Sequence, residues 1–387
     1  MRILFFIGGL GTGGAERQIA QLSDGLARRG HAVTVATIFP GGQNWEWLQK
    51  QGSTSLLSLF DKKAASFIVI AWQLALAVIR LRKIIYRERI TFTYSALYLS
   101  NVIAWLAVLG MRHVYLIMGI RASNLESNWK RAIPFHICRM VSFSVPILIA
   151  NSTAGLKFHE DKGYKSKIHY VIPNGININR FKFDAKERDR LRLEWGIGNQ
   201  VKLIGMVGRL DPMKDHSTFL RAAAIVAQKR NDVRFVCVGD GKEMYRTELH
   251  RLSEELGLTN SVIWAGDRHD MHNIYSALDI ATSSSAYGEG FPNCVGEAMA
   301  CGVPCVVTDV GDSAQIVNDT GIVVKPKRPE QLAEALLQIV SLNNIQRNTM
   351  GKAARSRIEN KFSVTSAVMA TEDALFRVSG KQATVNE

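Results

Sequence analysis

The chain has 387 residues, of which 47% are hydrophobic and 21% charged, and its formal net charge at pH 7 is +14. The length suits two to three domains, and the sequence shows neither an internal repeat nor a low-complexity tract, which argues against a repeat protein. Five cysteines without a C-x-x-C pair argue against a disulfide-framed secreted protein and indicate a reducing compartment.

The positive charge is confined to one half of the chain. Residues 1–180 hold 22 Lys and Arg against 8 Asp and Glu, whereas residues 181–387 hold 26 of each. A basic half predicts an anionic partner, which is nucleic acid, anionic lipid or a pyrophosphate-bearing substrate. We expect no nucleic acid, because the sequence has no recognised nucleic-acid-binding motif and no zinc-ligand spacing.

The first strand candidate, Ile3–Ile7, leads into a glycine pattern at Gly9–Gly14 that spells G-x-G-x-x-G, the dinucleotide fingerprint. That fingerprint also requires an acidic residue at the end of the second strand, where it holds a ribose hydroxyl. The second strand candidate, Ala32–Ile38, ends without one. We therefore interpret Gly11–Arg17 as a phosphate-facing loop and not as a nicotinamide site, with a plain strand-to-helix turn as the alternative.

Two amphipathic stretches of the basic half suit either a membrane surface or a protein core. Phe67–Ile79 is nearly all apolar, and Arg80, Arg82, Lys83, Arg87 and Arg89 follow it; the run is too short to span a bilayer. The second stretch is Trp129–Phe143. Each predicts a helix that is either buried in the domain or lies at the interface with basic residues toward lipid headgroups. Val102–Leu109, also apolar, is predicted to be core.

In the second half, the strand candidate Val201–Val207 is followed by Gly208-Arg209-Leu210-Asp211-Pro212-Met213-Lys214. Charged residues at the carboxyl end of a parallel strand lie where such sheets bind ligands. An arginine fork and a lysine point charge both suit a diphosphate, which gains negative charge as a leaving group. Alone, however, a basic pair in a loop is typical of solvated surface.

The segment Glu289-Gly290-Phe291-Pro292-Asn293-Cys294-Val295-Gly296-Glu297 sets two carboxylates eight positions apart across a glycine turn and a predicted helix start. It lies between the strand candidates Leu278–Thr282 and Val303–Thr308, so the pattern predicts a βαβ unit. Helix N-termini favour phosphate. The alternative for an isolated pair is a loop carboxylate followed by a solvated helical glutamate.

Together these segments resemble the retaining GT-B glycosyltransferases of family four, also called glycosyl transferases group 1, of the type that builds bacterial polysaccharides and glycoconjugates. The resemblance is dense from about residue 200 to 330 and thin before residue 40. It implies an α/β fold of the GT-B class, with two Rossmann-like, doubly wound domains facing each other across a cleft. Residues 1–176 would form the acceptor-side domain and 177–360 the donor domain, and a helix in 361–387 would return to the first domain.

The resemblance also implies the roles of individual residues in a metal-independent hexosyltransferase that needs no cofactor. Glu289 would contact the donor sugar, Glu297 would hold the ribose of the nucleotide, and Arg209 with Lys214 would stabilise the diphosphate. We thus predict Glu289, Arg209 and Lys214 as catalytic. The predicted donor-binding residues are Gly13, Gly14, Arg209, Lys214, Gly290, Phe291, Pro292, Asn293, Cys294 and Glu297, and Arg17 is a candidate phosphate or acceptor contact.

One position departs from the family pattern. Many relatives carry a histidine near the donor sugar after a strand of the first domain, where this chain has Tyr115–Arg121. Arg121 is the candidate replacement. A guanidinium can hold a diphosphate or an anionic acceptor but cannot exchange protons. His113 is predicted to precede the strand and to lie in the core or on the surface.

We expect a cytoplasmic protein, peripheral on the inner face of the cell membrane if the amphipathic stretches bind lipid, because Met1-Arg2 leads directly into a strand without a signal peptide. Its partners would be a UDP- or GDP-linked sugar and a glycan or lipid-linked saccharide, in exopolysaccharide, capsule or lipopolysaccharide synthesis. Two alternatives stay open: a GT-B epimerase or hydrolase of nucleotide-sugars, and a catalytically silent subunit that binds lipid or a partner.

Overall fold

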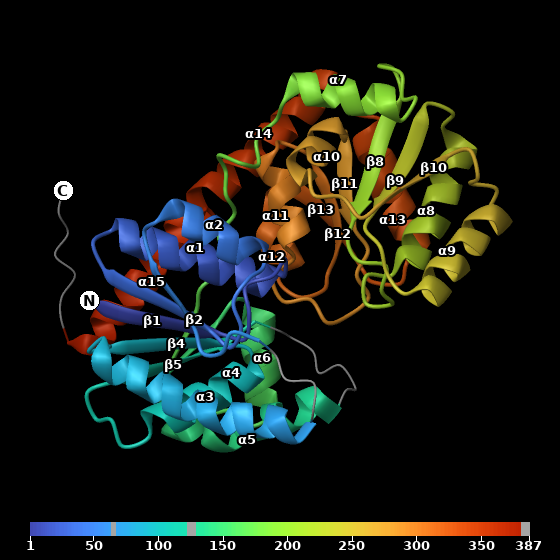
Figure 1. Cartoon of the computed structure of the whole chain (residues 1–387). Coiled ribbons are helices and arrows are strands. Elements are labelled where there is room, and N and C mark those ends of the chain that lie inside the picture. The colour runs from blue at the N-terminus through green and yellow to red at the C-terminus, as the bar shows by residue number, and fades with distance from the viewer. Residues whose placement is uncertain (63–66, 122–128, 381–387) are drawn as a thin grey trace. The chain divides into compact units, whose positions relative to one another are not determined.

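The structure, a computed structural model, describes residues 1–62, 67–121 and 129–380. The chain forms two compact units, one of Met1–Gly175 with Val364–Glu387 and one of Ile176–Ser363 (Figure 1). Each unit is built on one parallel β-sheet covered by helices on both faces. Two parallel sheets of this kind confirm the predicted α/β class with two Rossmann-like domains.

The first unit contains a seven-stranded sheet in the order β3-β2-β1-β4-β5-β6-β7. Its first strand, β1, is apolar on both faces: Ile3 and Phe5 pack into one hydrophobic cluster, whereas Leu4 and Phe6 pack into the other. Such a continuous apolar run is typical of a parallel strand buried on both sides. The strands are β1 (Arg2–Ile7), β2 (Ala32–Thr37), β3 (Ser55–Ser58), β4 (Phe92–Ala96), β5 (Tyr115–Ile120), β6 (Ile147–Ala150) and β7 (Ile168–Val171), and the helices are α1 (Gly14–Arg28), α2 (Gln43–Gln51), α3 (Phe67–Arg87), α4 (Tyr98–Val108), α5 (Trp129–Val141), η1 (Ser142–Ser144), α6 (Thr153–Asp161) and α15 (Val364–Ser379).

The second unit contains a six-stranded sheet in the order β10-β9-β8-β11-β12-β13. The predicted strands at Val201–Val207, Leu278–Thr282 and Val303–Thr308 are confirmed as β8, β11 and β12, with starts one or two residues later. The strands are β8 (Lys202–Val207), β9 (Val233–Val238), β10 (Val262–Gly266), β11 (Ile280–Ser283), β12 (Cys305–Thr308) and β13 (Gly321–Val324), and the helices are α7 (Ala185–Glu194), α8 (His216–Lys229), α9 (Glu243–Glu255), α10 (Met271–Ala277), α11 (Asn293–Ala300), α12 (Ser313–Val317), η2 (Asn318–Thr320), α13 (Pro329–Val340) and α14 (Asn344–Lys361).

The last helix, α15, packs on α1 at the start of the chain. Gly25 of α1 allows this contact, because a Cβ atom there would lie 2.4 Å from Cγ2 of Val368. Beside it, Glu372 accepts hydrogen bonds from Arg29 (2.8 Å) and from the ring of His31 (2.6 Å). Burial raises the pKa of Glu372, but these two hydrogen bonds outweigh burial and lower it. The carboxylate therefore remains ionised and ties the two ends of the unit together.

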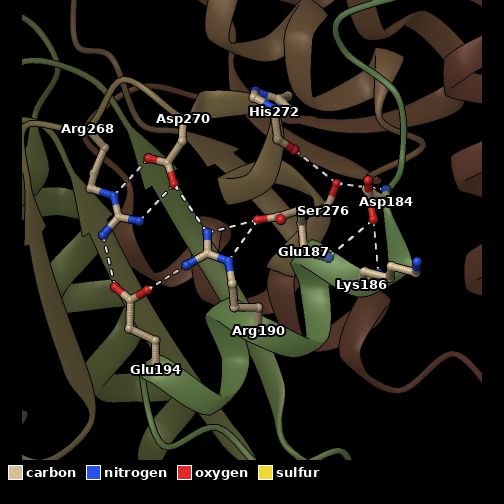
Figure 2. Close-up of polar contacts among 9 residues, drawn as sticks. All are labelled: Asp184, Lys186, Glu187, Arg190, Glu194, Arg268, Asp270, His272 and Ser276. Carbon is tan, nitrogen blue, oxygen red and sulfur yellow. Dashed lines mark hydrogen bonds and ion pairs between the residues drawn. The ribbon is translucent and has the colours of Figure 1, made fainter.

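Helix α7 is held to α10 of the second unit by polar contacts (Figure 2). Asp184 caps α7, because its carboxylate accepts from the amides of Lys186 (2.9 Å) and Glu187 (3.2 Å), while its own amide donates to Ser276 Oγ (3.0 Å) in α10. Every cation of the adjoining network has carboxylate partners: Arg190 pairs with Glu187, Glu194 and Asp270, and Arg268 pairs with Glu194 and Asp270.

Helices α3, α4 and α5 pack side by side over one face of the first sheet (Figure 1). Helix α3 buries a stripe of Ala77, Leu81 and Ile85, spaced four residues apart, and leaves other apolar side chains in solvent. The prediction that Val102–Leu109 is core is confirmed for Val102, Ile103, Ala104 and Ala107 but is wrong for Leu106 and Leu109, which are 39% and 50% exposed because they face away from the sheet.

The exposed apolar side chains of these helices form a surface that we call the apolar layer. Among the described residues, no helix combines the length and hydropathy that crossing a bilayer requires. The side chains of residues 67–71 and 129–131, which the sequence placed in the two amphipathic stretches, lie outside those described. The members of the apolar layer are Trp72, Leu76, Ile79, Tyr86, Leu97, Leu99, Leu106, Leu109, Ile133, Ile137, Met140 and Phe143.

Candidate functional site

The central strands of the second unit, β8 and β11, lie side by side, but the chain continues from β8 toward β9 on one side and from β11 toward β12 on the other. Such a reversal of strand order opens a crevice at the carboxyl ends of the strands, where α/β proteins bind ligands. Two loops leave the sheet at this point, residues 208–215 after β8 and residues 284–292 after β11.

Lys214 and Glu289 form a buried ion pair between these two loops. Lys214 Nζ donates to Glu289 Oε1, and Ser285 Oγ donates to the same oxygen at 2.7 Å. The side chains are only 16% and 7% exposed. Burial lowers the pKa of Lys214, but the adjacent carboxylate of Glu289 outweighs burial, so that the pKa is raised above its usual value. Lys214 is therefore a stable cation at the switch point of the sheet.

Glu297, the second carboxylate of the motif, lies in α11 and is 4% exposed. The hydroxyl of Tyr275, itself fully buried, donates to Glu297 Oε2 at 3.2 Å. The alternative of a solvated helical glutamate is therefore wrong. Burial raises the pKa of the Cys294 thiol to about 11, and the charges of Lys214, Glu289 and Glu297 act on the same thiol. Cys294 is therefore a protonated thiol at neutral pH.

Arg209 stands at the outer edge of this cluster. Its side chain is 59% exposed and pairs with Asp211 at 2.9 Å. Its charge acts to lower the pKa of Lys214, which follows it in the same loop after β8. The structure therefore brings Lys214 and Glu289 into direct contact, with Arg209 in the loop of Lys214 and Glu297 in the helix that follows the loop of Glu289.

Two residues that were not predicted as site residues, Ser284 and Gly311, help to position the site. Ser284 Oγ donates to the backbone oxygens of Lys214 (3.0 Å) and Asp215 (2.9 Å), and thereby joins the two loops. Gly311 has a φ of 62°, and a Cβ atom there would lie 2.6 Å from the carbonyl oxygens of Glu289 and Gly290. Only a glycine allows the loop after β12 to support the Glu289 loop this closely.

The other predicted donor-binding residues of this loop have mixed surroundings. Phe291 is 6% exposed and packs on Phe362 with ring centroids 5.6 Å apart, so its side chain belongs to the core. Pro292 caps α11, and its carbonyl accepts from the amide of Val295. Helix α11 begins at Asn293, so Phe291 and Pro292 separate its first amides from Glu289 and Gly290.

The glycine loop of the first unit is organised by Glu16. The amide of Gly13 donates to Glu16 Oε2 at 3.1 Å, and a Cβ atom at Gly11 or Gly13 would lie 3.0 or 3.2 Å from that oxygen. Gly14 is the first residue of α1, and the Arg17 amide donates to the Gly13 carbonyl at 2.9 Å. The carboxylate of Glu16 thus lies close against Gly11 and Gly13, and a phosphate contact at the Gly13 amide stays a prediction.

Arg121 follows β5 in the first unit and is held from two sides. Its guanidinium donates to Asn174 Oδ1 and to the hydroxyl of Tyr94, each at 2.9 Å. Its Nε is buried and has no hydrogen-bond partner in the part of the chain that the structure describes. His113 is exposed and precedes β5, as predicted.

No group of three or more His, Cys, Asp or Glu side chains that could hold a metal ion occurs within residues 1–62, 67–121 and 129–380.

Comparison with protein families yields one match in each unit. The family model of glycosyl transferases group 1 matches residues 187–357, and that of glycosyltransferase family 4 matches residues 12–180.

Curated relatives include two bacterial glycosyltransferases. The chain is 28% identical over 207 residues to the UDP-Gal:alpha-D-GlcNAc-diphosphoundecaprenol alpha-1,3-galactosyltransferase of Escherichia coli, covering 52% of each protein. It is 34% identical over 198 residues to the D-inositol 3-phosphate glycosyltransferase of Corynebacterium jeikeium, covering 48% of this chain and 46% of the relative. The chain thus matches about half the length of these relatives.

Solved structures match over nearly the whole chain. The structure of Anabaena HepE in complex with UDP and glucose has a TM-score of 0.80 and 22% identity, covering 97% of this chain and 99% of that one. WaaG, a glycosyltransferase involved in lipopolysaccharide biosynthesis, has a TM-score of 0.70 and 18% identity, covering 96% and 99%. These likenesses confirm the predicted GT-B fold class.

The buried pair predicts a pH-dependent defect in Lys214→Met. Removing the ammonium leaves Glu289 buried without its cation, which typically costs about 3 to 5 kcal/mol. Burial disfavours the charged form of an unpaired carboxylate, and protonation at acid pH removes that charge, so the destabilisation should be smaller at acid pH than at alkaline pH. The difference in unfolding free energy from wild type, measured in urea at pH 5 and pH 8, should be larger at pH 8.

The double variant Lys214→Met with Glu289→Gln should recover most of the loss, and Lys229→Met, which removes an exposed lysine of α8, should leave stability unchanged. An equal loss at both pH values would contradict the assignment of a buried, uncompensated carboxylate.

Proposed function

The chain belongs to the glycosyl transferases group 1, and we propose that it is a retaining hexosyltransferase that moves a sugar from a nucleotide-sugar to a hydroxyl of a glycan or lipid-linked saccharide. The observation that carries this proposal is the buried Lys214–Glu289 pair beside Glu297, at the reversal of strand order in the second sheet. Two carboxylates and two cations at one crevice suit a ligand with both hydroxyls and a diphosphate.

Each charged residue has a role in this proposal. Glu289 accepts hydrogen bonds from hydroxyls of the donor sugar, and Glu297 accepts from the ribose. Lys214 and Arg209 lie against the diphosphate, whose negative charge grows as the bond to the sugar breaks, so fixed cations stabilise the transition state more than the ground state. The raised pKa of Lys214 keeps its charge in place at neutral pH.

The reaction we propose retains the configuration at the anomeric carbon. The bond from this carbon to the diphosphate oxygen breaks, the bond to the acceptor oxygen forms on the same face, and the departing phosphate takes the acceptor proton. The cations Arg209 and Lys214 then carry the leaving-group charge without a divalent ion. A UDP- or GDP-linked donor is supported by relatives whose names specify UDP-Gal and GDP-mannose.

We extend the proposal to the place of action, which is the cytoplasmic face of a membrane in exopolysaccharide, capsule or lipopolysaccharide synthesis. A relative acts on a diphosphoundecaprenol-linked acceptor, and a structural neighbour serves lipopolysaccharide biosynthesis. The apolar layer supports this proposal: Trp72 and Ile79 of α3, Met140 of α5 and Phe143 of η1 are each more than half exposed. Surface patches of this kind mark interaction sites for lipid or protein.

Basic side chains border the apolar layer but differ in their surroundings. Arg82 donates to the backbone oxygens of Ala107 (3.0 Å) and Leu109 (2.8 Å), and Arg80 stacks on Phe60 at 4.4 Å, so both stabilise the domain. Lys83 and Arg87 are exposed one turn apart on α3. These two cations suit anionic headgroups beside the inserted apolar side chains.

Donor binding is tested by thermal denaturation of the protein with UDP, GDP and their sugars in the absence of metal. A ligand that binds only the folded state stabilises it by about 2.7 kcal/mol at 100 times its dissociation constant. One nucleotide family should raise the melting temperature of wild type and not that of Glu297→Gln, which keeps the shape of the side chain but loses the carboxylate.

The exposed substitution Glu248→Gln in α9 serves as the matched control and should respond like wild type. If no nucleotide shifts the melting temperature of wild type, the proposed donor site is wrong and the non-enzymatic alternative gains support.

Arg121 is tested by turnover of the donor found in that binding experiment. Arg121→Ala removes a cation that two side chains hold in place, so we expect turnover to fall about 100-fold while nucleotide binding is unchanged. Arg121→Lys should restore little, because a lysine cannot reproduce the planar fork between Asn174 and Tyr94. Full activity in Arg121→Ala would show that this residue takes no part in the reaction.

Membrane contact is tested by sedimentation with vesicles that contain anionic lipid. Met140→Glu and Phe143→Glu should each reduce binding at least tenfold, because each places a charge in the apolar layer. Met244→Glu is the matched control, since Met244 is 81% exposed on α9 of the second unit. Binding that is unaffected by all three substitutions would exclude the apolar layer as the lipid-binding surface.

A further inference from the structure

A second pocket lies in the second unit at the opposite end of the strands that build the donor site. It has a volume of about 510 Å³, within the range of small-molecule sites. Lys202 begins β8, Asp279 precedes β11 and the Cys301–Pro304 turn precedes β12, so the pocket lies at the amino ends of these strands. Helices α7 and α14 both lie at this end of the sheet (Figure 1).

The pocket is strongly basic. Among the described residues that line it, Asp279 is acidic and five are basic. The carboxylate of Asp279 is already satisfied by Arg188 (2.9 Å), by Arg192 (3.1 Å) and by the amide of Leu203 (2.9 Å). Burial raises the pKa of Asp279, but these partners outweigh burial and lower it. The basic residues are Arg188, Lys202, Arg347, Lys352 and Arg355.

Three of these cations lack a carboxylate partner. Arg355 pairs with Glu359 at 2.8 Å, and Arg188 pairs with Asp279. For Lys202, Arg347 and Lys352, the described part of the chain provides no ion pair within 4.0 Å. Arg347 is only 7% exposed, and the acceptors of its guanidinium are neutral: the backbone oxygen of Leu342 and the side-chain oxygen of Asn344.

Cations without a carboxylate partner are not typical of the neighbouring surface around α7. There, Arg190 and Arg268 are matched by three carboxylates (Figure 2). In the pocket, burial and the charge of Arg347 lower the pKa of Lys202, as expected for like charges that crowd one space. Cations that are partly removed from water and not paired destabilise the folded chain unless an anion joins them.

Neutral hydrogen-bond donors and the amino end of a helix also lie at the pocket and favour an anion there. The amino end of α14, an 18-residue helix, lies at the pocket, where Asn344, Arg347 and Asn348 of its first turns line the wall. The amino end of a helix carries a partial positive charge that favours phosphate. The side-chain amides of Asn344 and Asn348 are donors suited to phosphate oxygens.

We propose that this pocket binds a small molecule that carries at least two phosphate groups. One phosphate monoester contributes about 1.5 to 2 negative charges at pH 7, so a diphosphate matches the three cations without carboxylate partners, whereas a single phosphate does not. The concave shape and the enclosed position of Arg347 favour a small ligand over an extended polyanion. This inference does not depend on the proposed transferase activity, because none of the lining residues belongs to the donor site.

The test is titration of the full chain with inorganic pyrophosphate, followed by calorimetry and thermal denaturation at constant ionic strength. Wild type should bind pyrophosphate and gain melting temperature, and sulfate at the same ionic strength should have a much smaller effect. Lys202→Gln and Lys352→Gln should each weaken binding at least tenfold. Lys229→Gln removes the same charge from an exposed position of α8 and should bind like wild type.

Pyrophosphate could also bind at the donor site, and Lys214→Gln separates the two sites. Binding that persists in Lys214→Gln and weakens in the two pocket variants supports the proposal. Binding that is unchanged in Lys202→Gln and Lys352→Gln, or that is lost only in Lys214→Gln, overturns it. Because Lys352 is exposed on α14, its substitution does not endanger folding, and each variant is compared with its own ligand-free state.

Discussion

The second unit is organised around one buried ion pair, which lies between two loops at the carboxyl ends of its parallel strands. Lys214 and Glu289 are both largely buried, and neither charge is stable there without the other. Their pairing requires the loops after β8 and β11 to stay together, which Ser284 and Ser285 achieve by donating to the backbone and to the carboxylate. Gly311 allows the loop after β12 to pack closely against the backbone of the Glu289 loop. A crevice with fixed charges of both signs follows from this arrangement.

The same elements extend from the donor site to the basic pocket. Strands β8 and β11 start at Lys202 and just after Asp279, and each ends in a loop of the donor site. Helix α11 begins beside Glu289 and ends at the turn Cys301–Pro304 that lines the pocket. The two ends differ in charge balance, since the cations of the donor site have carboxylate partners and three cations of the pocket have none.

The first unit has a different physical character. It carries most of the positive excess of the chain, and its helices α3, α4 and α5 expose large apolar side chains. Exposed apolar and basic side chains together suit binding to a membrane surface that contains anionic lipid. In the glycine loop of this unit, the carboxylate of Glu16 accepts a hydrogen bond from the amide of Gly13 and lies close to Gly11.

From the sequence, the apolar strand pattern and the resemblance to the family-four glycosyltransferases predicted the α/β fold class, and the resemblance named Arg209, Lys214, Glu289 and Glu297 as candidate donor-site residues. Continuous apolar runs such as Ile3–Ile7 specify strands buried on both faces, and the spacing of Glu289 and Glu297 across a helix start is local, so both are readable without coordinates. Only the tertiary structure decided that Glu297 is buried against Tyr275, that Leu106 and Leu109 face solvent, and that Lys202 and Arg347, 145 positions apart, share one pocket. Burial and charge pairing depend on which segments distant in the chain pack together, and short-range spacing carries no information about that.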